Sequence, residues 1–491
     1  MAKLPRLSLV LACVAISRQI PFAHSLENGV ARTPPMGWMA WQRFRCEMDC
    51  TPDDHGRVNC VSEQLFRSIA DAMVSEGFAD AGYKYVSVDS CWAERERDEQ
   101  GHVVANRTRF PSGMAALSSY IHGKGLLFGL YTNMGPTMGS HSQSSSIAPG
   151  LNCSSGDVAS CSQAAVDIEY FTKSLEIDYL KVDADSGGAK YPGSEGGYCG
   201  STHVQSYNSS YPLVSRLLNA SGRPVLFYCS WPVGTSCHCG WPLQYQLMAQ
   251  HCSAVKQYHD VQDSWSSIET IIEYWARGSA LWTPGQKRCG SQSTSSAKSH
   301  PTGNLRGFLD LARPGSWNMP DQLVVGQTPC PGYPGMHCNT LTHAEEEAVF
   351  AFWAIWAAPL FMSHDPRATP AASKQILLNK AVIAVNQDPL GRQGTRVRNE
   401  SETGVQLWRR QLHDGIAVLL FNGNEFAQDI SFDISEVGFD SLTQVIATDL
   451  YANTTFGPFS GSYVAHNVPP HGVRMLKCVV PMHQCTMPVE N

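Results

Sequence analysis

The segment Tyr179-Leu180-Lys181-Val182-Asp183 has residue types and a spacing that could carry chemistry. Its apolar residues predict a short buried strand, and side chains two positions apart on a strand share a face, so Lys181 and Asp183 should point the same way. A buried ammonium beside a carboxylate keeps that carboxylate ionised at low pH. An ionised aspartate can act as a nucleophile. The alternative is a purely structural ion pair at a strand end.

This strand belongs to a longer alternation of strand-like and helix-like segments, which begins near residue 34 and ends near residue 385. Helical spacing of apolar residues is clear in segments such as 62–76 and 344–357. Eight alternations of this size predict an α/β fold, a (β/α)₈ barrel, in which chemistry lies at the carboxyl ends of the strands. The predicted strands are 36–41, 85–90, 126–133, 179–184, 224–230, 255–261, 316–322 and 359–363.

The predicted strand ends carry mainly acidic and aromatic residues, a combination that suits a polyhydroxylated ligand such as a sugar. They are Trp41, Asp89, Tyr131, Asp183, Ser230, Asp260 and Asp321. The formal net charge of -7 argues against a surface that binds polyanions, so we expect no nucleic-acid partner.

The pattern changes after residues 386–391. Short alternating runs separated by Gly, Asn and Asp replace the helices, which predicts an antiparallel β-sandwich. We therefore expect a signal peptide over residues 1–25, a catalytic barrel over residues 26–391 and a C-terminal sandwich over residues 392–491.

The first residues have the pattern of a secretory signal. Lys3 and Arg6 precede an apolar run over residues 7–16, and Ala23 and Ser25 supply the small residues of a cleavage site. No later stretch of about 18 apolar residues without charges follows, so no membrane span is expected. The predicted location is the secretory pathway, with lysosome and extracellular space both open.

Cysteines and sequons fit that location. Cleavage would remove Cys13, one of 17 cysteines, and the even remainder favours disulfides over metal sites. We expect neither a metal nor another cofactor, although Cys237-His238-Cys239 offers a conceivable metal site. Glycosylation sequons lie at Asn106, Asn208, Asn219, Asn399 and Asn453, with a further, weaker one at Asn152.

Eight motifs, in order along residues 26–391, resemble the α-galactosidase / α-N-acetylgalactosaminidase family. Each is weak alone, but their order makes coincidence negligible. They are Leu26-Glu27-Asn28-Gly29, Pro35-Met36-Gly37-Trp38, Asp89-Ser90-Cys91-Trp92, Leu180-Lys181-Val182-Asp183, Cys229-Ser230-Trp231-Pro232, Gln262-Asp263-Ser264-Trp265, Pro314-Gly315-Ser316-Trp317-Asn318 and Asn386-Gln387-Asp388-Pro389-Leu390-Gly391.

The resemblance implies a retaining glycosidase that works by double displacement. Asp183 falls on the nucleophile position and Asp260 on the general acid/base position, and retention requires two carboxyl groups about 5–5.5 Å apart. Lys181 should then keep Asp183 ionised, whereas Asp260 should have a raised pKa so that it can protonate the leaving oxygen. Asp263 competes for the acid role, but its setting favours a capping or orienting residue at the following helix.

The implied sugar pocket departs from the family in places. Asp89 matches the first of two adjacent acids that bind sugar hydroxyls, but Ser90 replaces the second. Lys256 stands where the family usually has an arginine, and a lysine cannot make the bidentate contacts of a guanidinium. The resemblance implies Trp41 and Tyr131 as pocket walls and Asp321 as a further pocket acid. Trp38, Trp92 and Trp231 are expected to be packing residues.

Substrate choice should depend on the loop after the fifth strand. Animal α-galactosidases carry Glu and Leu there, and α-N-acetylgalactosaminidases carry Ser and Ala. Ser230 and Val233 here favour an α-galactosidase that also accepts α-GalNAc glycans. A strict α-N-acetylgalactosaminidase stays open, as does a catalytically dead, galactose-binding lectin-like protein.

The resemblance also implies three disulfides and suggests a homodimer. The implied pairs are Cys46–Cys91, Cys50–Cys60 and Cys229–Cys252. Short loops suggest Cys330–Cys338 and Cys478–Cys485 as further pairs. The pairing of Cys153, Cys161, Cys199, Cys237, Cys239 and Cys289 stays open.

Overall fold

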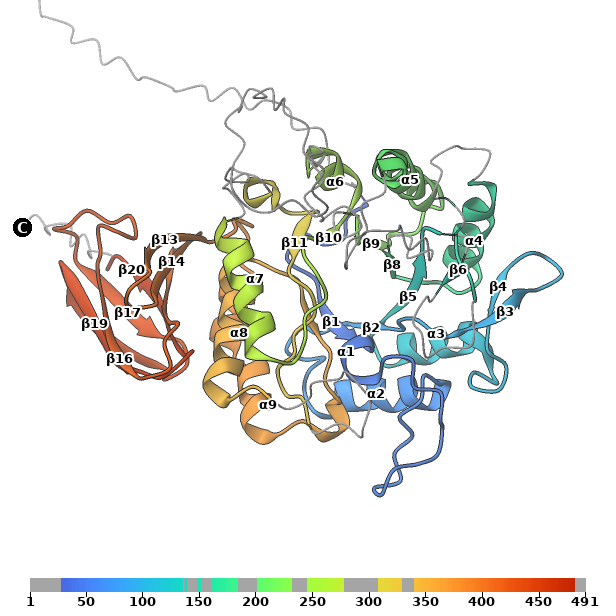
Figure 1. Cartoon of the computed structure of the whole chain (residues 1–491), viewed down its shortest axis with the longest axis horizontal. Helices are drawn as coiled ribbons and strands as arrows, with labels where there is room; N and C mark the ends of the chain where they lie inside the picture. The colour runs from blue at the N-terminus through green and yellow to red at the C-terminus, as the bar shows by residue number, and fades with distance from the viewer. Residues whose placement is uncertain are drawn as a thin grey trace, which may run out of the picture.

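The computed structural model describes residues 28–135, 137–138, 148–151, 153, 161–183, 201–231, 245–277, 308–328 and 340–481. A barrel surrounded by helices and a β-sandwich lie side by side (Figure 1). Several sequence predictions fall outside the described residues. They concern the signal peptide 1–25, Asn152, Val233 and the cysteines Cys199, Cys237, Cys239, Cys289, Cys330, Cys338 and Cys485.

The predicted eight-stranded barrel is confirmed. All neighbouring strands pair in parallel, in the order β11-β10-β9-β8-β5-β2-β1-β12. A parallel bridge between Leu323 and Met362 joins the two ends of the sheet. The strands are β1 (Met36–Met39), β2 (Tyr85–Ser87), β5 (Leu127–Asn133), β8 (Tyr179–Asp183), β9 (Leu226–Cys229), β10 (Ala254–Lys256), β11 (Trp317–Met319) and β12 (Leu360–Met362).

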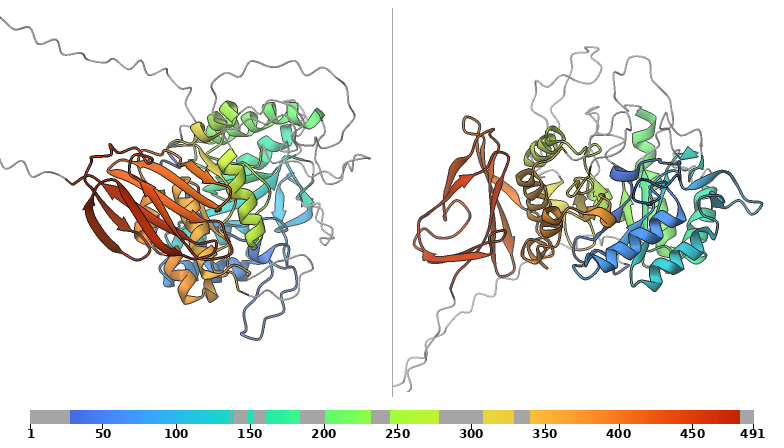
Figure 2. Two further views of the ribbon diagram at one scale, coloured as in Figure 1. Left: turned by 60° about the vertical axis from the view of Figure 1, so that its left-hand side comes forward. Right: turned by 90° about the horizontal axis from the view of Figure 1, so that it is seen from below.

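Helices cover the outside of this barrel, as both views in Figure 2 show. Ser62 caps α2 by accepting a hydrogen bond from the backbone N–H of Leu65, and the apolar face of the helix is buried. The helices are α1 (Trp41–Phe44), α2 (Glu63–Ser75), α3 (Gly113–Gly123), α4 (Ser162–Lys173), α5 (Ser201–Ala220), α6 (Tyr245–His251), α7 (Trp265–Arg277), α8 (His343–Ile355), α9 (Ala371–Leu377) and α10 (Lys380–Asn386).

Strand alternation decides which residues of β8 reach the barrel interior. Leu180 and Val182 join the large core beneath the helices, whereas Tyr179 joins a separate cluster with Met39 and Phe361. Residues two apart share a face, so Lys181 and Asp183 continue the row of Tyr179 toward the carboxyl end of the strand. Residues that could do chemistry therefore stand above an aromatic floor.

The C-terminal strands form the predicted antiparallel sandwich. One sheet has the order β13-β14-β15-β20-β17-β18, and β16 pairs with β19. The strands are β13 (Thr395–Glu400), β14 (Val405–Leu412), β15 (Gly415–Asn422), β16 (Gln428–Asp433), β17 (Val445–Asp449), β18 (Thr454–Phe459), β19 (Ser462–Val468) and β20 (Val473–Val479). Cys478 in β20 is buried and forms no disulfide with another described cysteine, and its predicted partner Cys485 lies outside the described residues, so this pair stays a prediction.

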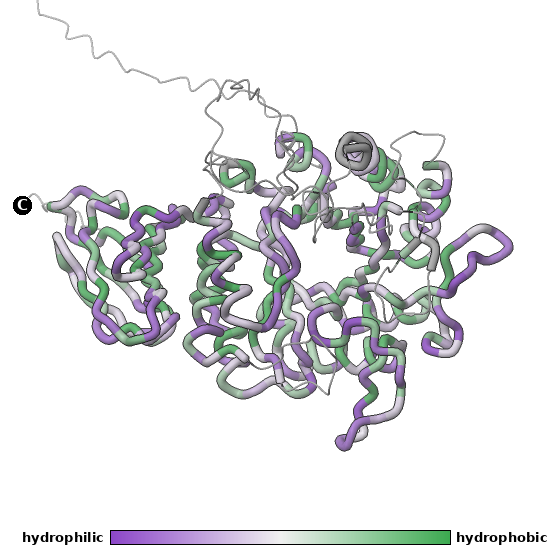
Figure 3. Tube along the Cα trace, viewed as in Figure 1, coloured by the Kyte–Doolittle hydropathy of each residue, from purple (hydrophilic) through white to green (hydrophobic). Residues whose placement is uncertain are grey.

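The sandwich packs on the barrel through β14 and β15. Leu419 and Phe421 join the barrel core, whereas the alternate residue Leu420 joins the sandwich core. The Phe421 ring centroid lies 5.2 Å from that of Phe352 in α8. Burial on both faces explains why β15 is an uninterrupted apolar run. By contrast, the β3 (Ala93–Arg97)–β4 (Val103–Ala105) hairpin, which sequence reasoning missed, projects from the barrel and is mostly hydrophilic (Figure 3).

Candidate active site

Lys181 at the mouth of the barrel forms its ion pair with Asp89, not with Asp183. Its Nζ lies 2.8 Å from Asp89 Oδ2, and both side chains are almost fully buried. Desolvation lowers the pKa of Lys181, but the charges of Asp89 and Asp183 outweigh it and raise the pKa. Lys181 therefore stays protonated and contributes a positive charge near Asp183, but the expected direct Lys181–Asp183 pair is wrong.

Tyr131 is the direct partner of Asp183. Its hydroxyl donates to Asp183 Oδ2 at 3.1 Å, because β5 and β8 are adjacent and Tyr131 lies in register with Lys181. Desolvation and the charge of Asp183 raise the pKa of Tyr131 well above its usual value. The hydroxyl therefore remains a donor that holds the carboxylate of Asp183 in place.

Lys256 bridges the two other carboxyl groups of the site. It is the last residue of β10, and its Nζ hydrogen bonds to Asp260 and lies 3.2 Å from Asp321 Oδ2. Lys256 is 4% exposed. Desolvation lowers its pKa, but the charges of Asp260 and Asp321 outweigh that effect and raise it. A single buried ammonium thus compensates two carboxyl groups.

Asp260 does not have the raised pKa expected of a general acid. Desolvation raises the pKa of this carboxyl, but the charge and hydrogen bond of Lys256, with Lys181 and Arg45 beyond, lower it overall. The side chain is 45% exposed because Asp260 lies in a loop four residues beyond the end of β10. The pairing with Lys256 therefore keeps Asp260 ionised.

Asp321 has the opposite shift. Desolvation, assisted by the negative charge of Asp260, raises its pKa despite the nearby Lys256. Its backbone has a φ of 126°, a region that residues with a Cβ rarely adopt. Oδ2 accepts from the N–H of Val261 at 2.9 Å, and Oδ1 from the N–H of Gln322 at 2.8 Å. The strained backbone thus aims Asp321 at the turn that carries Asp260.

Arg45 is a site residue that sequence reasoning missed. Its pKa is lowered by desolvation, against the charges of Asp260, Asp321 and Asp89, so it belongs to the same charge cluster. Its guanidinium lies 5.0 Å from the ring centroid of Trp41, at the start of α1. The available signal was its position beside Cys46, since a Cys46 disulfide implied by the family would tie this segment to the end of β2.

The described part of the mouth thus holds four carboxyl groups and three cations. They are Asp89, Asp183, Asp260 and Asp321 with Lys181, Lys256 and Arg45. Ser90 is buried beside this cluster, and its N–H donates to Asp89 Oδ1 at 2.8 Å. An alternating arrangement of charges with a tyrosine hydroxyl can bind several hydroxyl groups of a sugar.

Ser230 follows β9 at the wall next to β8. Its N–H donates to the carbonyl of Val182 at 3.1 Å. The side chain is 1% exposed, and its Oγ has no hydrogen-bond partner among the residues that the structure describes. Trp231 stacks on Tyr211 at 5.1 Å, so it is a packing residue as predicted. Trp38 and Trp92 are likewise fully buried.

The predicted capping role of Asp263 is wrong. Helix α7 begins at Trp265, and Ser264 Oγ accepts from the N–H of Ser267 at 3.4 Å, so Ser264 is the N-cap. Asp263 is buried in the preceding turn, and its carbonyl accepts a hydrogen bond from Thr340 Oγ1. An orienting role for Asp263 stays a prediction.

Disulfides cross-link several segments of the barrel domain. The structure contains the three implied pairs Cys46–Cys91, Cys50–Cys60 and Cys229–Cys252, and a fourth, Cys153–Cys161, which sequence reasoning had left open. The side chains of Asn106, Asn208, Asn219, Asn399 and Asn453 are all at least partly exposed, so each predicted sequon is accessible.

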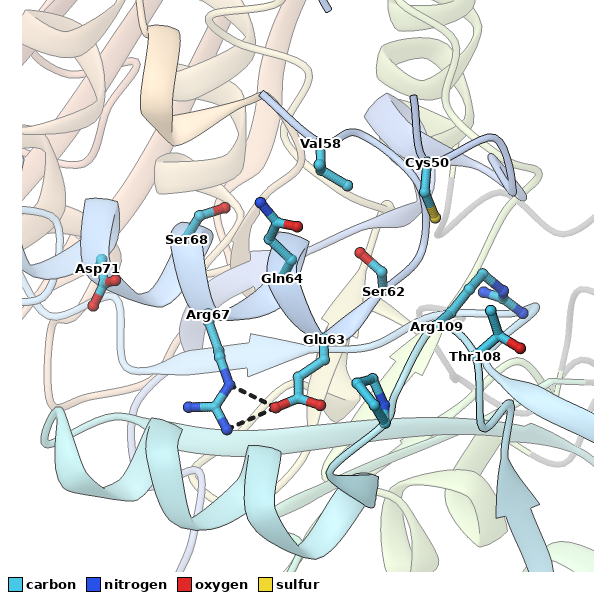
Figure 4. Close-up of a pocket in the computed structure, with 11 residues that line it drawn as sticks. Cys50, Val58, Ser62, Glu63, Gln64, Arg67, Ser68, Asp71, Thr108 and Arg109 are labelled. Carbon is cyan, nitrogen blue, oxygen red and sulfur yellow. Dashed lines mark hydrogen bonds and ion pairs between the residues drawn. The ribbon is translucent and has the colours of Figure 1, made fainter. Parts of the chain in front are cut away.

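A separate hollow of about 490 Å³ lies on the flank of the barrel beside α2 (Figure 4). Its one internal carboxylate–guanidinium pair joins Glu63 and Arg67 at 2.7 Å. Glu63 also accepts from the N–H of Ser112 at 2.9 Å. Because these groups satisfy one another, the mouth of the barrel is the better candidate site. No helix in the described ranges is long and apolar enough to cross a membrane.

Comparisons with known proteins agree with this geometry. The sequence profile described as alpha galactosidase A matches residues 33–286 and 292–388, and that of the alpha galactosidase C-terminal beta sandwich domain matches residues 402–478. Human alpha-galactosidase A is 34% identical over 425 residues, covering 86% of this chain and 81% of its own.

Two further relatives span nearly the whole length. Alpha-N-acetylgalactosaminidase from Gallus gallus is 30% identical over 455 residues, covering 92% of this chain and 94% of its own. The crystal structure of alpha-galactosidase I from Mortierella vinacea aligns with a TM-score of 0.66 and 25% identity, over 92% of this chain and 98% of that one.

Proposed function

The chain belongs to the alpha-galactosidase A family of glycoside hydrolases, and we propose that it removes terminal α-galactosyl residues, and also α-N-acetylgalactosaminyl residues, from glycans with retention of configuration. Asp183 is the nucleophile and Asp260 the general acid/base. The observation that carries the proposal is the single charge cluster at the barrel mouth, in which Asp183 is held by Tyr131 while Asp260 comes from a separate loop.

In the first step an oxygen of Asp183 forms a bond to the anomeric carbon while the glycosidic C–O bond breaks. The leaving oxygen takes a proton from Asp260, so no free alkoxide forms. In the second step a water oxygen attacks the anomeric carbon, Asp260 takes its proton, and the bond to Asp183 breaks. Lys181, whose own pKa is raised by the charges of Asp89 and Asp183, contributes a fixed positive charge beside the nucleophile.

The acid step requires a protonated Asp260, whereas Lys256 keeps it ionised. Substrate binding can resolve this conflict. A sugar hydroxyl that accepts a hydrogen bond from Lys256 would draw the ammonium away from Asp260 toward Asp321. Asp260 would then lose its main stabilising partner, and its pKa would rise. Lys256 therefore couples substrate binding to the activation of the acid.

The buried Oγ of Ser230, which has no hydrogen-bond partner within the described ranges, supports acceptance of an acetamido group. A small hydroxyl on this wall, instead of a bulky carboxylate, leaves room near the sugar and a group that can hydrogen bond to an amide. Family resemblance implies that position 233 lines the same wall, and its valine has a smaller side chain than the leucine of animal α-galactosidases. Relatives named for one activity and relatives named for the other match this chain at similar sequence identity. A strict α-N-acetylgalactosaminidase is the second candidate, and the same Ser230 favours it.

Preservation of both acids argues against the lectin-like alternative. A binding site alone gives no reason to keep Asp183, Asp260 and Lys181 in one charge cluster. We further propose that the protein acts in the lysosome or extracellular space, because its sequons are accessible and its disulfides need an oxidising compartment. A homodimer remains part of this proposal by family resemblance.

Release of p-nitrophenol from its α-galactoside and α-GalNAc derivatives tests the proposal. The wild type should cleave both, and Asp183→Asn should cleave neither. Cleavage of neither substrate by well-folded wild type would favour the lectin-like reading. Cleavage of the α-GalNAc substrate alone would establish the strict N-acetylgalactosaminidase.

A further inference from the structure

His471, in the turn between β19 and β20 of the sandwich, makes two close contacts with the barrel. Its Nδ1 lies 2.7 Å from Glu345 Oε1, and its ring stacks on Trp265 with centroids 4.5 Å apart and an interplanar angle of 12°. The His471 side chain is 13% exposed and Glu345 is 7% exposed. Its second carboxylate contact, to Glu425 at 3.2 Å, is with a side chain that is 87% exposed and screened by water.

Both barrel contacts lie where helices begin. Trp265 is the first residue of α7, five positions after Asp260. Glu345 belongs to the capping box of α8, and its Oε2 accepts from the N–H of Thr342 at 2.6 Å. The segment before that cap contacts the turn that precedes α7, because Thr340 Oγ1 donates a hydrogen bond to the carbonyl of Asp263. His471 therefore ties together two helix starts that enclose the turn of residues 260–264.

That turn is internally braced. The N–H of Gln262 donates to Ser267 Oγ at 2.9 Å, and the N–H of Ser264 donates to the carbonyl of Gln262 at 2.8 Å. The N–H of Val261 is held by Asp321 at 2.9 Å. Because these bonds join the turn to the first turn of α7, a displacement of Trp265 moves the turn and the carboxyl group of Asp260.

We propose that His471 is a positioning residue for Asp260, so that the C-terminal sandwich takes part in the acid/base step without touching the sugar. The inference rests on the proposed role of Asp260. The backbone of His471 is itself fixed, with a φ of 52° and its N–H 3.3 Å from the carbonyl of Asn424. The imidazole thus transmits the position of the sandwich to the turn, and displacement by about 1 Å can cost about 10²-fold in rate.

The test uses the full-length enzyme and two α-galactosides with different leaving groups. Methyl α-galactoside needs a proton on its leaving oxygen, whereas 2,4-dinitrophenyl α-galactoside does not. His471→Ala should lower the ratio of kcat on the methyl substrate to kcat on the dinitrophenyl substrate by about tenfold or more. A ratio measured on one sample does not depend on the folded fraction, so partial misfolding leaves the test valid.

Matched variants separate positioning from stability. His466→Ala removes a histidine of β19 whose side chain is 75% exposed, and should leave the ratio unchanged. His471→Gln keeps a donor for Glu345 but loses the stacking, and should give an intermediate ratio. An unchanged ratio in His471→Ala, even with a lower melting temperature, would overturn the inference.

Asp260→Asn, assayed on the same two substrates, distinguishes this inference from the proposed function. If Asp260→Asn shows the leaving-group dependence and His471→Ala does not, only the positioning role fails. If Asp260→Asn itself shows no such dependence, the acid/base assignment fails, and the positioning role fails with it.

Discussion

Lys181 Nζ lies 2.8 Å from Asp89 Oδ2, and the hydroxyl of Tyr131 is the group that holds Asp183. The lysine of the Lys-Val-Asp segment therefore compensates a buried acid from a different strand, while its effect on Asp183 acts through charge over a longer distance. The Asp183 carboxylate therefore accepts a hydrogen bond from a neutral hydroxyl. Breaking that hydrogen bond when Asp183 attacks the sugar costs less free energy than breaking a salt bridge.

Replacing Lys181 should destabilise the protein as well as the site. In Lys181→Met the buried Asp89 carboxyl loses its ion-pair partner, which should lower the free energy of unfolding by about 3–5 kcal/mol. Lys181→Met with Asp89→Asn should recover much of that loss, because both charges are then gone. Urea unfolding of the two single variants and the double variant measures this. Simple additivity of the two single effects would show that the pair is not coupled.

Lys256 should control the pH range of the enzyme. Its charge lowers the pKa of Asp260, and a general acid works only below its own pKa. Lys256→Met should therefore raise this pKa and move the alkaline limb of kcat/KM to higher pH, while KM rises through the loss of a sugar contact. Lys256→Arg keeps the charge and should leave the limb near its wild-type position. A limb that stays fixed in Lys256→Met, or moves to lower pH, contradicts the assignment.

His364 should make the fold less stable in acid. It is fully buried after β12, and desolvation lowers its pKa to about 4. In the unfolded chain a histidine has a pKa of about 6.5. Between these two pKa values the unfolded state binds more protons, so the free energy of unfolding rises with pH. The full effect is about 3 kcal/mol, lost as pH falls through that window.

Free energies of unfolding in urea at several pH values test this expectation. His364→Gln removes the titrating group and should flatten the rise between pH 4 and 6.5 relative to wild type. An identical pH dependence in the two proteins would show that His364 does not titrate differently on unfolding.

Ser230 and Val233 should set the choice between the two sugars. Ser230→Glu with Val233→Leu narrows the proposed wall, which should reduce kcat/KM on p-nitrophenyl α-GalNAc relative to the α-galactoside by about 10–200-fold. Ser90→Ala is a suitable comparison, because Ser90 lies beside Asp89 at the end of a different strand. An equal loss of kcat/KM on both substrates in the double variant would mean that this wall does not distinguish the acetamido group from the hydroxyl at the second carbon of the sugar.

The sequence predicts the scaffold well because periodicity is a local property. All eight barrel strands are found, and Ser62 and Thr342 mark helix starts through their own side chains. Predicted strands such as 255–261 are longer than observed, since apolar residues in the following loop are buried too. Mostly exposed strands such as β18 were missed because they lack an apolar alternation.

Partners at the mouth were less predictable, because they depend on which strands become neighbours. Alternation correctly places Lys181 and Asp183 on one face but cannot show that Asp89 lies closer to the ammonium. The pKa of Asp260 is lowered because Lys256 forms an ion pair with it. The position of one side chain relative to the other cannot be derived from their spacing in the sequence. The link from His471 to Trp265 joins residues about two hundred positions apart and could only be seen in three dimensions.

The anomer released first is the most direct measurement of the central claim, which is double displacement through Asp183 and Asp260. Proton NMR of a p-nitrophenyl α-galactoside digest, recorded before mutarotation, should show α-galactose as the initial product. Initial appearance of β-galactose would mean a single displacement by water and would contradict the assignment of Asp183 as nucleophile.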